Sequence, residues 1–140
     1  MTRKISSFIL FLFLLACGSQ PTANDSDLDT ENPSIARGKE VYMKSCVACH
    51  QANGQGVEGA FPPLANSDFL LADKKRAIAI AANGMEGEIT VNGVKYNAIM
   101  APQSLSKKEV KDVVNYILNA WGNNGGEVTM QEVHDVLTGE

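Results

Sequence analysis

Cys46-Val47-Ala48-Cys49-His50 is a CxxCH segment, in which two residues separate a pair of thiols and an imidazole follows at once. This spacing is typical of c-type haem attachment. Two residues between the thiols let both sulfurs meet the two vinyl groups of one porphyrin, and the next residue then presents its imidazole to the iron. The segment therefore predicts one covalent haem c, with Cys46, Cys49 and His50 as its binding residues.

Three other roles for these residues compete with haem attachment. A thioredoxin-like redox pair usually follows a strand in an alternation of strands and helices, which this chain lacks. A zinc site needs four ligands, and beyond these three only His134 is an obvious nitrogen donor. A plain disulfide leaves His50 without a role. Haem attachment is the interpretation that uses all three residues.

The length and composition of the chain fit one compact domain, since it has 140 residues of which 44% are apolar. Its formal net charge of -4 offers no polycationic face for a nucleic acid backbone, so nucleic acid binding is not expected. The longest apolar stretch, Phe8 to Ala16, is far shorter than the roughly 20 residues of a membrane-spanning helix. No spanning helix is predicted in the mature chain.

The beginning of the sequence has the features of an export signal. Arg3 and Lys4 give it a positive start, an apolar run follows, and Leu14-Leu15-Ala16-Cys17 is a processing site that ends in cysteine. This pattern resembles the bacterial lipoprotein signal, with an ordinary secretory peptide as the alternative. Residues 1–16 are therefore predicted to be removed and Cys17 to be acylated. The protein is expected on the periplasmic side, lipid-anchored to a bacterial membrane.

Residues 17–33 are predicted to be a flexible acidic tether, because they are polar and contain almost nothing to bury. The acids of this run are Asp25, Asp27, Asp29 and Glu31. A globular domain is expected over residues 34–122, followed by a peripheral C-terminal tail over residues 123–140 with a short helical turn around Glu132 to Leu137.

The helix signals of the domain predict an all-α fold. Asn32 can cap a first helix, Asp73 can cap a second, and Ser106-Lys107-Lys108-Glu109 is a capping box that starts the last one. These helices are expected at residues 33–46, 74–83 and 107–121. Asn92-Gly93 lies between two short β-prone runs and predicts a small hairpin near residues 88–97.

Together these features resemble the class I c-type cytochromes, and in particular monohaem bacterial members. The resemblance covers about residues 34–122. It rests on Gly38 and Tyr42, the CxxCH segment, the loop with Gly54, Gly56 and Pro62-Pro63-Leu64, and Met100 before the last helix. It implies a cytochrome c fold in which the first and last helices cross closely at Gly38, around one haem. The hairpin resembles cytochrome domains associated with terminal oxidases and reductases.

The resemblance also implies the remaining ligands. Met100, in the segment before the last helix, would be the sixth ligand of the iron. Met43 is on the attachment helix and Met130 is in the tail, whereas Met85 follows a helix end and could swing in, although filling the core is the commoner role. The backbone carbonyl of Pro62 would accept a hydrogen bond from the outer nitrogen of His50 and fix its orientation.

A histidine and methionine pair fills both axial positions of the iron, which predicts a one-electron carrier and not an enzyme. The expected partners are a donor and an acceptor redox protein, such as a terminal oxidase or reductase, with the domain itself monomeric. One alternative is a haem peroxidase or gas sensor whose methionine is displaced. The other is a thiol–disulfide redox module that uses Cys46 and Cys49.

Overall fold

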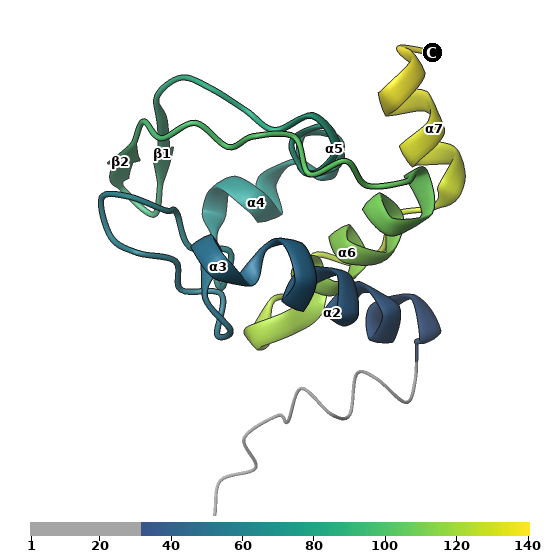
Figure 1. The fold of residues 1–140 in the computed structure, drawn as a ribbon, viewed down its shortest axis with the longest axis horizontal. Helices are drawn as coiled ribbons and strands as arrows, with labels where there is room; N and C mark the ends of the chain where they lie inside the picture. The colour runs from purple at the N-terminus through teal and green to yellow at the C-terminus, as the bar shows by residue number, and fades with distance from the viewer. Residues whose placement is uncertain (1–31) are drawn as a thin grey trace, which may run out of the picture.

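The computed structural model describes residues 32–140, shown in Figure 1. The predicted signal peptide at residues 1–16, the lipidation site Cys17 and the tether up to residue 31 lie outside the described residues. Among residues 32–140, none of the helices is long and apolar enough to cross a membrane.

The described chain is mainly helical, with one small antiparallel hairpin, as predicted. In chain order the elements are α2 (Pro33–Ser45), α3 (Val47–His50), α4 (Asp68–Ala72), α5 (Lys74–Asn83), β1 (Ile89–Val91), β2 (Val94–Tyr96), α6 (Lys107–Asn119), the 3-10 turn η1 (Ala120–Gly122) and α7 (Met130–Thr138). The hairpin pairs Ile89 with Tyr96 and turns at Asn92-Gly93. A segment without regular structure, residues 97–105, returns from the hairpin to α6 (Figure 1). We call this segment the strap.

Helices α2 and α6 pack directly against each other and form the centre of the domain (Figure 1). The Asn32 side chain caps α2 by accepting a hydrogen bond from the backbone nitrogen of Ser34 at 2.9 Å. At the crossing, a Cβ atom on Gly38 would lie 1.9 Å from the backbone oxygen of Asp112. Only glycine allows this approach. Gly38, one of the residues that carry the family resemblance, therefore has a clear packing role.

A buried carboxylate joins the two helices beside this crossing. The Asp112 carboxylate accepts hydrogen bonds from Ser34 Oγ at 2.6 Å and from Arg37 Nε at 2.7 Å. Burial favours the neutral acid, but the hydrogen bonds from Arg37 and Ser34 outweigh it and hold the pKa of Asp112 below its usual value. The carboxylate therefore stays charged and satisfied inside the crossing.

Three aromatic rings extend the contact between α2 and α6 toward the CxxCH segment. The ring centroids of Tyr42, Tyr116 and Trp121 lie 5.0 to 5.4 Å apart. Trp121 Nε1 donates to the backbone oxygen of Ala52 at 3.0 Å, and Tyr42 Oη donates to that of Gln51 at 2.6 Å. The end of α6 is thereby bound to the loop that follows His50.

The C-terminal segment, residues 123–140, is not the peripheral tail that the sequence suggested. Helix α7 is longer than the predicted turn and packs on α5 and α6, with Val128 and Val133 in the same buried core as those helices. The Asn115 side chain also bonds the backbone of Val128, accepting from its nitrogen at 2.7 Å and donating to its oxygen at 3.2 Å. The compact unit therefore continues well beyond residue 122.

Candidate functional site

The CxxCH segment lies where α2 gives way to the short helix α3. Cys46 caps both helices, and its backbone oxygen accepts from the backbone nitrogen of His50 at 3.0 Å. Residues three and four apart on one helical turn lie on the same side, so Cys46, Cys49 and His50 are grouped. Both cysteines are free thiols, and burial, followed by the nearby Cys49 thiol, raises the pKa of Cys46 to about 11.

The His50 ring is buried and has a fixed orientation. Its Nδ1 lies 3.0 Å from the backbone oxygen of Pro62. Because a carbonyl oxygen can only accept, Nδ1 carries the hydrogen and donates it. Burial lowers the pKa of His50 more than this hydrogen bond raises it, which favours the neutral ring. A neutral ring protonated at Nδ1 has a free lone pair at Nε2, which is the form that binds a metal.

The loop after α3 holds the Pro62 carbonyl in place. Val57 and Phe61 pair across it, and the backbone nitrogen of Gly56 donates to the oxygen of His50 at 3.0 Å. Gly56 has a φ of 62°, and a Cβ atom there would lie 2.2 Å from the oxygen of Phe61 and 2.7 Å from that of Pro62. Glycine at this position therefore allows the loop to close onto His50.

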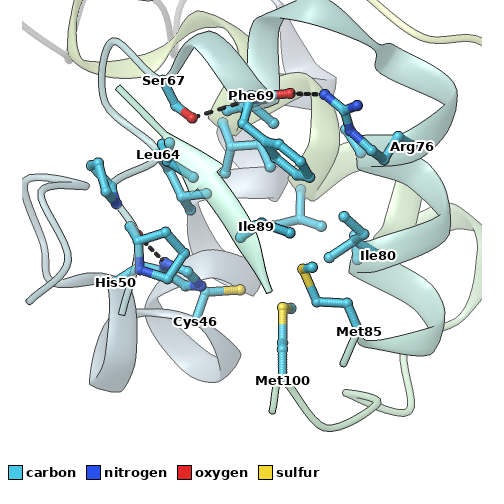
Figure 2. A pocket seen from close by; sticks show the side chains of 18 of the residues that line it. Cys46, His50, Leu64, Ser67, Phe69, Arg76, Ile80, Met85, Ile89 and Met100 are labelled. Carbon is cyan, nitrogen blue, oxygen red and sulfur yellow. Dashed lines mark hydrogen bonds between the residues drawn. The ribbon is translucent and has the colours of Figure 1, made fainter. Parts of the chain in front are cut away.

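A cavity opens beside His50 (Figure 2), and a second hollow that shares His50, Pro62 and Met100 with it adjoins it. The walls of the first are mostly apolar. They include Leu64, Phe69, Leu70, Ala77, Ile80, Ala81, Ile89, Val91, Leu105, Val113 and Ile117. A space with such apolar walls and a few polar or sulfur-bearing side chains suits a cofactor.

The strap closes the cavity on the side away from α3. Met100 lies on the strap and exchanges two backbone hydrogen bonds with Met85, each of 2.9 Å. A Cβ atom on Gly84, the residue that ends α5, would lie 2.1 Å from the oxygen of Met100. The strap thus lies against the end of α5, and its methionine side chain points into the cavity with that of Met85 (Figure 2).

The structure brings all the sequence-predicted haem-site residues to this space. The first cavity is lined by Cys46, His50, Pro62 and Met100. The second hollow is lined by Cys49, His50, Pro62 and Met100. His134, which a zinc site would have needed, lies instead on α7 with its Nδ1 2.9 Å from Lys107 Nζ. Within residues 32–140, no group of three or more histidine, cysteine, aspartate or glutamate side chains is arranged to hold a metal ion.

The donor set on the cavity walls fits haem c. Two free thiols and a neutral imidazole lie on one side, where they could bind a porphyrin edge and its iron. A thioether, the soft ligand that cytochrome iron accepts, lies on the other. The apolar lining between them suits the faces of a porphyrin ring. The facing thioether and the apolar lining are independent of the CxxCH spacing from which haem was predicted.

Two further residues contribute to the cavity wall, of which only Met85 was named from the sequence, as a methionine that could swing in. Arg76 lines the cavity, with its guanidinium carbon 3.8 Å from the centroid of the Phe69 ring and its Nη2 donating to the Phe69 backbone oxygen. Met85 pairs with Met100. No local sequence pattern marks either contact, although the position of Met85 directly after the helix-ending Gly84 placed it near a turn.

Comparison with known proteins supports the same interpretation. The family model described as cytochrome c matches residues 35–121. Cytochrome c-552 of Thermus thermophilus is 41% identical over 93 residues, which cover 63% of this chain and 70% of that protein.

Two other relatives are parts of larger assemblies by name. The cytochrome c subunit of the quinone-type alcohol dehydrogenase of Gluconobacter oxydans is 34% identical over 106 residues, covering 72% of this chain and 22% of that protein. The CcoP subunit of the cbb3-type cytochrome c oxidase of an Azospirillum species is 29% identical over 101 residues, covering 69% of this chain and 34% of that protein. The chain thus spans only a minor part of these two subunits.

The loop that supports His50 yields a testable prediction. Gly56→Ala should destabilise the protein more than Gly59→Ala, although both residues have a left-handed φ, of 62° and 75°. A Cβ at position 59 meets nothing within 4 Å, whereas one at position 56 meets the Phe61 and Pro62 carbonyls. The extra loss of unfolding free energy should be about 1 to 3 kcal/mol, measured by guanidinium denaturation of the full chain. Equal losses in the two variants would contradict this role of Gly56.

Proposed function

The chain belongs to the cytochrome c family and is an electron carrier with one covalent haem c, and we propose that it works as a lipid-anchored carrier between redox proteins on the periplasmic side of a bacterial membrane. We further propose that it transforms no substrate of its own. The observation that supports this function best is the placement of an imidazole and a thioether on facing walls of one apolar cavity.

The residues that would hold the haem follow from their positions around that cavity. Cys46 and Cys49 would form the two thioether bonds, and His50 Nε2 and the Met100 sulfur would bind the iron. When bound, the haem iron supplies the change between the ferrous and ferric states. The hydrogen bond from His50 Nδ1 to Pro62 fixes the ring, so that Nε2 keeps one direction.

The surroundings of this site favour the reduced state. A thioether is a soft donor that stabilises ferrous over ferric iron. A histidine and methionine pair therefore raises the reduction potential relative to a pair of histidines. The apolar wall acts in the same direction, because the ferric state carries one more positive charge, which low-dielectric surroundings disfavour. We therefore propose a relatively high potential, suited to donating electrons to an oxidase.

Features of the site weigh against the two alternative functions. A peroxidase or gas sensor needs an open iron position, whereas the two backbone hydrogen bonds between Met85 and Met100 hold the strap closed. A thiol–disulfide module needs a thiolate, whereas burial raises the pKa of Cys46 to about 11 and suppresses that form near neutral pH.

The relatives indicate what kind of partner to expect. Proteins named as subunits of an alcohol dehydrogenase and of a cbb3-type oxidase contain related domains. We propose that the donor or acceptor of this chain is likewise a membrane enzyme that releases or consumes electrons, such as a terminal oxidase or reductase. A tether at residues 17–33 would keep the domain near such enzymes and raise its effective concentration.

Haem attachment can be tested by intact mass. The full chain, expressed for export together with a cytochrome c maturation system, should carry the mass of one haem. The double variant Cys46→Ala and Cys49→Ala should carry none, because both thioether bonds are lost. Ser45→Ala, which changes the neighbouring residue and leaves the thiols, serves as the control and should retain the haem. Wild-type protein without the added mass would contradict the proposed function.

The lipid anchor can be tested by fractionation. Cys17→Ser should move the exported protein from the membrane to the soluble fraction, because serine cannot form the thioether to a diacylglycerol. Ser19→Ala, two residues away, is the matched control and should stay with the membrane. If Cys17→Ser left the distribution unchanged, the anchor would be ruled out, while the electron-carrier function would stand.

A further inference from the structure

Two methionine side chains, and not one, face the cavity that His50 lines. Met85 and Met100 both contribute to the walls of the two adjoining hollows. Figure 2 shows their sulfur atoms inside the same space, with His50 and Cys46 across from them. Two other methionines of the described chain, Met43 on α2 and Met130 on α7, are 49% and 44% exposed and do not line it.

The backbone fixes the relation between the two thioethers. The nitrogen of each residue donates to the oxygen of the other at 2.9 Å, so Met85 and Met100 form a hydrogen-bonded antiparallel pair. The side chains of such a pair leave the backbone on the same face, with Cα atoms about 5.5 Å apart. Gly84 makes this pairing possible, because a Cβ atom there would meet the oxygen of Met100 at 2.1 Å.

Methionine is well suited to use this proximity. Its side chain is unbranched with three rotatable bonds, so its sulfur can reach a range of positions from one backbone site. A position reached by the sulfur of Met100 is therefore within range of the Met85 side chain as well.

We propose that Met85 is a second thioether ligand for the iron, which takes the sixth position when Met100 is removed or withdrawn. This inference rests on the proposed haem site and adds a residue to it. Met100 remains the resting ligand, since it lies on the strap. Met85 keeps the iron six-coordinate in its absence, and the site then stays closed to dioxygen and peroxide. The strap can thus move away from the iron without leaving a position at which dioxygen or peroxide could bind.

The test compares four proteins: wild type, Met85→Leu, Met100→Leu and the double variant. Leucine keeps a similar volume and removes only the sulfur. The readout is the near-infrared charge-transfer band from sulfur to ferric iron, which reports a thioether ligand. The band should be present in wild type and in Met85→Leu, persist at a shifted position in Met100→Leu, and vanish in the double variant. Met100→Ala, alone and with Met85→Leu, repeats the comparison should the leucine variant mature poorly.

A second readout is the binding of added imidazole to the ferric variants. The double variant, which has no thioether in the cavity, should bind imidazole at least about tenfold more tightly than Met100→Leu, in which Met85 must first be displaced.

Loss of the band in both Met100→Leu and Met100→Ala, with imidazole affinities equal to those of the corresponding double variants, would overturn the role of Met85. That result would leave the proposed function intact, because wild type would still show the band. Loss of the band in Met85→Leu alone would overturn the assignment of Met85 as the reserve ligand. Absence of the band or of haem in wild type would instead defeat the proposed site together with this inference.

Discussion

The close crossing of α2 and α6 at Gly38 is the constraint on which the site depends. The backbone of α6 occupies the space that a Cβ atom on this residue would need, with the Asp112 oxygen 1.9 Å from that position. The crossing fixes the axis of α2, and hence where its last turn presents Cys46 and His50. The aromatic rings of Tyr42, Tyr116 and Trp121 then bind the end of α6 to the loop after His50.

Backbone groups, more than side chains, position the proposed ligands. The Pro62 carbonyl orients the His50 ring, and its own place depends on the glycine at position 56. The strap is held on the opposite wall by the backbone pairing of Met100 with Met85. Both contacts are accepted or donated by backbone groups, which every residue possesses. The site therefore needs glycine at a few positions, while the rest of its lining is ordinary apolar side chains. The arrangement holds the His50 imidazole in one direction and fixes the backbone from which the Met100 sulfur reaches into the cavity.

Local signals in the sequence predicted much of this molecule, because they act over a few residues. The CxxCH segment, the cap at Asn32, the capping box at Ser106 and the Asn92-Gly93 turn led to the family, the haem and the helices with the hairpin between them. The packing of α7 was missed, because Val128 and Val133 gain their partners only from distant helices and Asn115. The capping box formed by Thr129 and Glu132 was the available signal for that helix. The pairing of Met85 with Met100 and the stacking of Arg76 on Phe69 depend on the folded backbone, which no short pattern encodes.

The proposed function requires that His50 and Met100 together leave the haem iron no free position for another ligand. The most direct measurement is a redox titration of the matured full-length chain, followed through the visible and near-infrared spectrum, with and without carbon monoxide. A closed iron site should give a single one-electron transition, a sulfur-to-iron band that is present only in the ferric state, and a ferrous spectrum that carbon monoxide leaves unchanged. A ferrous form that binds carbon monoxide readily, or a chain without haem absorption, would contradict it.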